Sequence, residues 1–142
     1  MGDATKQRQP IPPECERVSA AIVDAALTVH RALGPGLLES TYETCLTHEL
    51  RKRGFSVRTQ VALPIQYDDM RIESAYRIDM LVDELVIVEN KAVEALERVH
   101  KAQLLTYLKL SKLRLGLLIN FNEVLLRTGV RRFVNSSATA ES

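Results

Sequence analysis

Apolar residues recur every three or four positions through the first part of the chain. Between Glu16 and Leu33 this spacing predicts a helix with one buried face. Gly34-Pro35-Gly36 follows, and it should end the helix because glycine suits the residue after a helix and proline cannot continue one. The same spacing predicts a second helix from Leu37 to Arg53, which ends before Gly54.

The period changes at Phe55, where β-branched residues become frequent. A strand is predicted from Phe55 to Tyr67, with Pro64 marking an edge strand or a break because proline cannot donate to a ladder. From Tyr76 to Val82 polar and apolar residues alternate. One face of this strand should carry Ile78, Met80 and Val82, and the other Arg77, Asp79 and Leu81. The almost unbroken apolar run from Leu85 to Lys91 predicts a strand covered on both faces.

Helical spacing returns from Glu94 to Lys112, and a buried strand is predicted from Leu113 to Asn120. A weaker strand pattern runs from about Val124 to Phe133. The order of elements is therefore ααβββαββ. This order predicts an α/β fold in which helices flank both sides of a central mixed sheet.

The chain has 142 residues, which suits a single domain, and we place that domain at residues 16–134. Residues 1–15 are polar and contain several prolines, so we expect a flexible N-terminal arm. The Ser- and Ala-rich residues 135–142 should form a flexible C-terminal tail. We find no internal repeat.

Charge and composition narrow the function classes only slightly. The 19 Lys and Arg residues face 18 Asp and Glu residues, so the net charge gives no global electrostatic case for binding nucleic acid. Cys15 and Cys45 lack the spacing of a metal site and are expected as reduced thiols, with one disulfide left open. No apolar run is long enough to span a bilayer, and we expect a cytoplasmic protein.

Local clusters of basic residues could still bind nucleic acid even though the net charge is near zero. Helix ends and edge strands are also basic for solubility and capping, and we favour that explanation. The clusters comprise Arg51, Lys52, Arg53, Arg58, Lys109, Lys112 and Arg114 on one flank, and Arg127, Arg131 and Arg132 on another.

Polar residues interrupt the predicted core at the end of its most apolar strand. Glu89 and Lys91 are two residues apart, so their side chains project from the same face. Asp79 lies on the preceding strand. Buried carboxylates are costly unless a positive group neutralises them, and oxygen ligands of this kind suit Mg²⁺. The alternative is that Glu-x-Lys is a solvated strand end with a weak ion pair.

The turn between these strands decides whether the two acids meet. A two-residue turn at Asp83-Glu84 would pair Asp79 with Val88 and direct Glu89 to the opposite face. A three-residue turn from Asp83 to Leu85, or a bulge nearby, would instead place Asp79 opposite Glu89, with their Cβ atoms about 5 Å apart. We predict the second arrangement.

Two predicted helices carry polar residues where core is expected. Glu39 falls within the apolar arc of its helix, which indicates either an acid favoured by the helix N-terminus or a side chain that reaches the metal site. Gln103 and Tyr107 share one face of the later helix and lie near His100. They either form local hydrogen bonds at the core edge or help to position a phosphate, a water or Lys91.

The motifs together resemble the GxxExxY proteins, small prokaryotic members of the PD-(D/E)XK nuclease superfamily. The resemblance covers roughly residues 16–134, and one residue departs from it, because an apolar side chain is expected where Asn90 stands. It rests on Gly36-Leu37-Leu38-Glu39-Ser40-Thr41-Tyr42, Tyr76-Arg77-Ile78-Asp79, Ile87-Val88-Glu89-Asn90-Lys91-Ala92, the segment from His100 to Leu108, and that from Leu115 to Phe121.

The resemblance implies a restriction-endonuclease-like core and a role for each candidate residue. Asp79, Glu89 and Lys91 would fill the catalytic positions, Glu39 would supply the helix carboxylate, and Gln103 with Tyr107 the auxiliary motif. Mg²⁺, which Mn²⁺ can replace, would be held by Asp79, Glu89, Glu39 and the carbonyl of Asn90. The implied substrate is nucleic acid, DNA rather than RNA. One alternative is a catalytically weak or inactive protein of the same fold that acts as a nucleic-acid-binding or regulatory module, and another is a metal-dependent hydrolase of a smaller phosphoester. A homodimer or a protein partner stays open.

Overall fold

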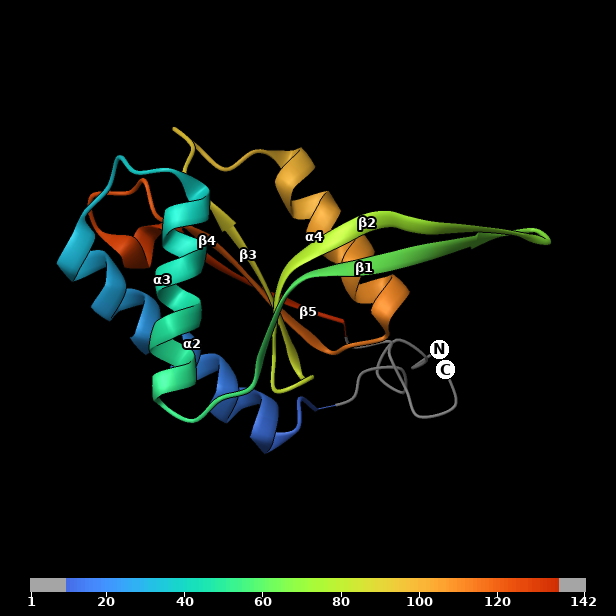
Figure 1. Ribbon diagram of the computed structural model, residues 1–142, viewed down its shortest axis with the longest axis horizontal. Coiled ribbons are helices and arrows are strands. Elements are labelled where there is room, and N and C mark those ends of the chain that lie inside the picture. The colour runs from blue at the N-terminus through green and yellow to red at the C-terminus, as the bar shows by residue number, and fades with distance from the viewer. Residues whose placement is uncertain (1–9, 136–142) are drawn as a thin grey trace, which may run out of the picture.

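A computed structural model describes residues 10–135 of the chain. Within this range three α-helices and five strands follow the predicted order, and two helices lie on one side of the sheet and one on the other (Figure 1). The elements are α2 (Pro13–Leu33), α3 (Glu39–Lys52), β1 (Val57–Tyr67), β2 (Met70–Val82), β3 (Val86–Lys91), α4 (Arg98–Ser111), β4 (Leu115–Asn120), the 3-10 turn η1 (Leu126–Gly129) and β5 (Val130–Val134). The α/β fold predicted from the sequence is confirmed.

The sheet has the order β1-β2-β3-β4-β5 and is mixed. Only β3 and β4 are parallel, and α4 connects them, since parallel neighbours need a crossover of this kind. All of β4 and all of β3 except Lys91 are buried, which explains why both strands read as apolar runs. One core lies between the sheet and α2 with α3, and a second lies between the sheet and α4.

Tyr42 fixes the start of α3. Its ring stacks on Phe121 with centroids 4.5 Å apart. Its hydroxyl donates to the carbonyl of Gly34 and accepts from the amide of Leu37 at 3.1 Å. These contacts fold the Gly-Pro-Gly connection against the helix, so α3 begins at a defined place beside the end of β3.

The β2–β3 hairpin has the register that the sequence predicted. Asp83 and Glu84 both adopt left-handed conformations, with φ of 52° and 57°, and the amide of Leu85 donates to the carbonyl of Val82 at 3.0 Å. Val82 then pairs with Val86, so Leu85 stands outside the pairing as one extra residue. The prediction of a bulge or a three-residue turn is confirmed, and the register leads from this turn toward Asp79 and Glu89.

The β1–β2 ribbon continues past β3 as a long arm (Figure 1). Its register shifts between Leu63 and Ile65, where Pro64 stands, as the sequence predicted. Gln60, with φ of 53°, lies opposite Asp79, and the regular alternation of side chains between the two faces of the ribbon is interrupted there. Ile78 therefore packs with the α4 core and Met80 with the α2–α3 core. The prediction that these two residues share a face was wrong.

Several predicted boundaries also need correction. The helix begins at Pro13, inside the expected arm, because proline is well suited to the first position of a helix. β2 begins at Met70 rather than at Tyr76, because it pairs with β1 along the arm. The predicted strand from Val124 starts only at Val130, after η1.

The two predicted ends fall largely outside the described residues. Residues 1–9 of the expected arm and 136–142 of the expected tail are not described. Asn135, the first residue of that tail, is held in place: its side-chain amide donates to the carbonyls of Leu108 and Leu113 at 3.3 and 3.2 Å. Among residues 10–135, no helix is long and apolar enough to cross a membrane. Cys15 and Cys45 are both free thiols.

Candidate active site

Two carboxylates meet where the β2–β3 ladder ends. Met80 and Val88 form the last regular pair. Beyond them, the amide of Asp79 donates to Glu89 Oε2 at 2.9 Å, and the amide of Asn90 donates to Asp79 Oδ2 at 2.9 Å. Each acid is thus held by the backbone of the opposite strand, and the strands part around the pair.

Burial makes this pair hard to ionise. Glu89 is only 4% exposed, and burial together with the charge of Asp79 raises its pKa to about 8. Burial also raises the pKa of Asp79, although the amide of Asn90 and the charge of Lys91 oppose that shift. The pair therefore favours a neighbouring proton or cation at neutral pH.

Lys91 carries the positive charge that lies closest to Glu89 in the sequence. It is half-buried at the end of β3, and its carbonyl accepts from the amide of Phe121 at 2.8 Å. Its charge lowers the pKa of both Asp79 and Glu89. Within the described residues it forms no ion pair with either acid, so its ammonium group is available to a further ligand.

Helix α3 brings two further acids to the site. Glu39 is exposed, and its Oε2 accepts from the amide of Ala92 at 3.2 Å, just beyond Lys91. Glu43, one helical turn later, was missed in the sequence. Burial raises its pKa, and the charges of Asp79 and Glu39 add to that effect. The spacing of four residues from Glu39 was the available signal, since such residues share a helix face.

Gln60 connects α3 to β2 and was also missed. Its Nε2 lies 3.2 Å from both carboxylate oxygens of Glu43. A hydrogen bond from the same side chain lowers the pKa of Asp79. Its own carbonyl is taken by Arg77 Nη1 at 3.3 Å, so the ladder is broken opposite Asp79. No sequence pattern marks a glutamine that adopts a left-handed conformation within a strand.

On the α4 side, Tyr107 lies near enough to the two acids for their charges to affect its pKa. Burial, followed by the charges of Glu89 and Asp79, raises the pKa of Tyr107 to about 12, so its hydroxyl stays protonated. Its ring contacts that of Tyr76, with centroids 5.8 Å apart. Gln103, half-buried one turn earlier, forms no hydrogen bond within residues 10–135. His100 Nδ1 accepts from the amide of Glu97 at 2.9 Å, a local helix cap.

Asn90 turns its side chain away from the acids, as strand parity predicted. It is 1% exposed. Its Nδ2 donates to the sulfur of Met80 at 3.1 Å, and its Oδ1 has no hydrogen-bond partner among residues 10–135. Its backbone N–H points toward β2, and in a strand the carbonyl of the same residue points the same way. That carbonyl is therefore directed to the place where the strands part.

The donor set fits a hard divalent cation. Two desolvated carboxylates and a backbone carbonyl converge, and Mg²⁺ is commonly held by one or two carboxylates with waters and substrate phosphates. Within the described residues no group of three Asp, Glu, His or Cys side chains stands ready to hold a metal ion. The arrangement suits a cation that shares its ligands with a substrate.

The comparison with protein families decides the identity. A model described as the PD-(D/E)XK nuclease superfamily matches residues 16–133. The chain belongs to the PD-(D/E)XK nuclease superfamily. PD-(D/E)XK nucleases generally use divalent metal ions and act on nucleic acid, in keeping with the donor set above. Searches of curated proteins and of solved structures found no match.

Four residues of the expected basic flanks form ion pairs with acids. Arg58 bonds to Glu84 through two 2.8 Å contacts, and Arg132 pairs with Glu16 at 2.7 Å. Arg53 pairs with Asp24 and Glu49, and Lys52 with Glu49. These pairs favour solubility and capping as the explanation for the flanks. Arg51 differs, because its Nη2 donates to the carbonyl of Val57 at 2.6 Å.

Proposed function

We propose that this PD-(D/E)XK protein is a Mg²⁺-dependent endonuclease of the GxxExxY family that hydrolyses phosphodiester bonds, in DNA rather than RNA. One observation carries the proposal: at the end of the β2–β3 ladder, Asp79 and Glu89 each accept a hydrogen bond from the backbone of the opposite strand. Lys91 follows Glu89 on β3. The preference for DNA and the family subtype rest on resemblance alone.

Each carboxylate and carbonyl has a place in this proposal. Asp79, Glu89 and the carbonyl of Asn90 would hold Mg²⁺ or Mn²⁺, and Glu39 would bind it directly or through water. When bound, the cation would polarise a phosphoryl oxygen and lower the pKa of the attacking water. Glu43 and Gln60 would keep Asp79 in position from the side of α3.

Side chains of the protein would orient the attacking water and stabilise the negative charge that develops on the phosphate. Hydrolysis forms a bond between the water oxygen and phosphorus and breaks the bond from phosphorus to the leaving sugar oxygen. A proton from the water ends on that sugar oxygen, and charge builds on the phosphoryl oxygens in the transition state. The Lys91 ammonium would orient the water and stabilise that charge. The protonated hydroxyl of Tyr107 would donate a hydrogen bond to the phosphate, and Gln103 would assist from one turn away.

Cleavage of plasmid and oligonucleotide substrates with Mg²⁺ or Mn²⁺ tests the proposal. Asp79→Ala and Lys91→Ala should each lower the cleavage rate by about a hundredfold or more, since the first removes a ligand of the metal ion and the second removes a cation that stabilises charge in the transition state. The control is Glu84→Ala, which removes an exposed acid from the turn of the same hairpin and should leave cleavage unchanged.

Two outcomes would contradict the proposal in different ways. Cleavage that persists in both variants would mean that these residues do not form the site. Absence of cleavage on DNA and RNA alike, with metal binding intact, would instead favour a regulatory protein that retains the nuclease fold.

A further inference from the structure

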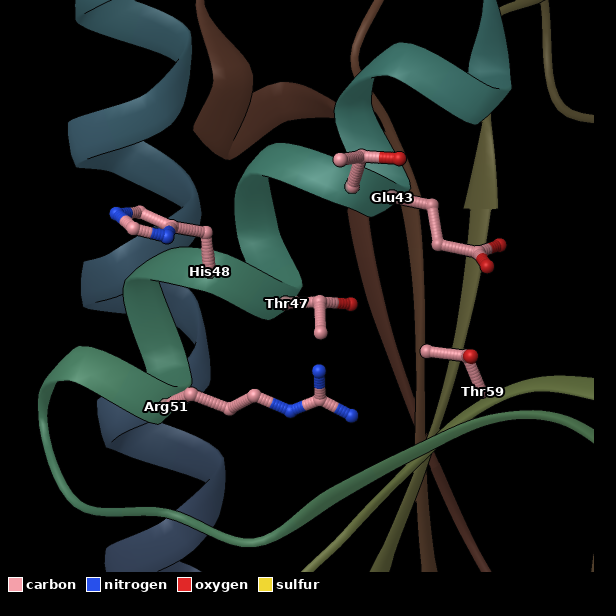
Figure 2. Close-up of a pocket in the computed structure, with 6 residues that line it drawn as sticks. Glu43, Thr47, His48, Arg51 and Thr59 are labelled. Carbon is pink, nitrogen blue, oxygen red and sulfur yellow. The ribbon is translucent and has the colours of Figure 1, made fainter.

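A polar pocket of about 370 Å³ lies between α3 and β1, and Glu43, which also lies near Asp79, forms part of its lining. Figure 2 shows Thr47 and Arg51 projecting from α3 toward Thr59, while His48 points away from them. The lining residues are Glu43, Thr44, Thr47, His48, Arg51 and Thr59. Because Glu43 also contacts Gln60, beside Asp79, the pocket adjoins the carboxylate pair.

The hydroxyl of Thr47 is the first sign of a ligand. Thr47 is 7% exposed, and its Oγ1 has no hydrogen-bond partner in the part of the chain that the structure describes. A threonine within a helix commonly bonds to the carbonyl four residues earlier, but this one does not. In Figure 2 the oxygen points from α3 toward the strands. A buried hydroxyl without a partner is costly, so a group that bonds to it would be stabilised there.

Arg51 supplies the positive charge. Its Nη2 donates to the carbonyl of Val57 at 2.6 Å, which holds the guanidinium beside the pocket. In the described part of the chain it pairs with no acid, in contrast to Arg53 and Arg58. A guanidinium has five N–H donors, so donors remain for a ligand in the pocket.

Phosphate is the ligand class that these groups fit. A guanidinium with neighbouring hydroxyl donors matches the oxygens of a phosphate, and Arg is well suited to that geometry. Glu43 would oppose an anion, but Gln60 Nε2 lies 3.2 Å from both of its oxygens, and burial raises its pKa. Both oxygens of Glu43 are thus already occupied by Gln60.

We propose that this pocket binds a phosphate of the nucleic-acid strand that adjoins the phosphate being cleaved. The inference rests on the proposed nuclease function, and it deepens that function by naming a contact that sets the position of the strand. Contacts to backbone phosphates fix register and orientation without reading sequence. Thr47, Thr59 and Arg51 would therefore guide the strand into the site whatever its sequence.

Binding of a short DNA duplex, measured by fluorescence anisotropy with Ca²⁺ in place of Mg²⁺, tests this inference. Thr47→Val and Arg51→Gln should each weaken binding roughly tenfold, the effect of losing a hydrogen bond to a charged group. Lys52→Gln is the matched control, because it removes a charge from an exposed side chain one residue away on α3. Thr47→Val should not lower the melting temperature, since it removes a hydroxyl that forms no hydrogen bond with the described residues.

A neutral methylphosphonate placed at one linkage at a time would locate the contact. Wild-type protein should lose affinity at one linkage beside the cleaved bond, and Arg51→Gln should be insensitive there. If duplex binding and cleavage are present but Thr47→Val matches wild type and Arg51→Gln matches Lys52→Gln, this inference is wrong and the proposed function stands. If wild type neither binds nor cleaves nucleic acid, both fail.

Discussion

The buried Glu89 carboxyl should make the protein less stable as the pH rises. In the folded protein its pKa is raised from the ordinary 4.5 to about 8, chiefly by burial and then by the charge of Asp79. The unfolded chain has the ordinary value. Between these two values the folded state holds a proton that the unfolded state has lost. The free energy of unfolding must therefore fall as the pH rises through that window.

The size of this effect follows from the same two values. A pKa that moves from 4.5 to about 8 corresponds, at about 1.4 kcal/mol for each pH unit, to at most about 5 kcal/mol. Because the two acids titrate as an interacting pair, we expect less than this maximum, on the order of 3 kcal/mol across the window. Domains of this size are stable by only about 5–15 kcal/mol, so the change is large enough to measure.

Urea denaturation of metal-free protein between about pH 5 and pH 8 measures the effect. Wild type should lose stability steadily, and Glu89→Gln should remove most of the slope because an amide does not titrate. Glu84→Gln is the control, since Glu84 is exposed and paired with Arg58, and it should keep the wild-type slope. A wild-type stability that is flat or rises over this range, or an equal slope in Glu89→Gln, would refute the reasoning.

Three further substitutions test particular contacts. Asn90→Leu should raise the free energy of unfolding in urea by about 1–2 kcal/mol, because it removes a buried oxygen without a partner; a loss of stability would contradict this. Tyr107→Phe should slow single-turnover cleavage about tenfold by removing one hydrogen-bond donor, and an unchanged rate would exclude that role. Glu84→Gly should not lower the melting temperature, since φ is 57° there and its ion pair with Arg58 is exposed; a clear drop would show that the pair matters.

The sequence predicted the strand register at the site because a chemical requirement and a geometric one coincide. If Asp79 and Glu89 are to meet, the turn between them must contain an extra residue, and Leu85 is that residue. The sequence also predicted β3 and β4 from their apolar runs, because strands covered on both faces carry few polar residues.

The missed features depend on contacts between distant parts of the chain. Ile78 changes face because Gln60, on the neighbouring strand, leaves the extended conformation, and alternation within β2 alone cannot show this. The burial of Glu43 and Thr47 depends on how α3 lies against β1. The predicted β2 was too short because the polar and apolar residues of the arm pair only between β1 and β2, so they show no regular pattern of burial.

Calorimetric titration with Mn²⁺ tests the central claim most directly, because it examines the carboxylate pair without assuming a substrate. Wild-type protein should bind Mn²⁺, and Asp79→Asn and Glu89→Gln should each weaken that binding about tenfold or more, as expected when a charged oxygen ligand is lost. Glu84→Gln, at an exposed position of the same hairpin, should bind as wild type does. No Mn²⁺ binding by wild type, or equal binding by all four proteins, would contradict the assignment of Asp79 and Glu89 as the metal site.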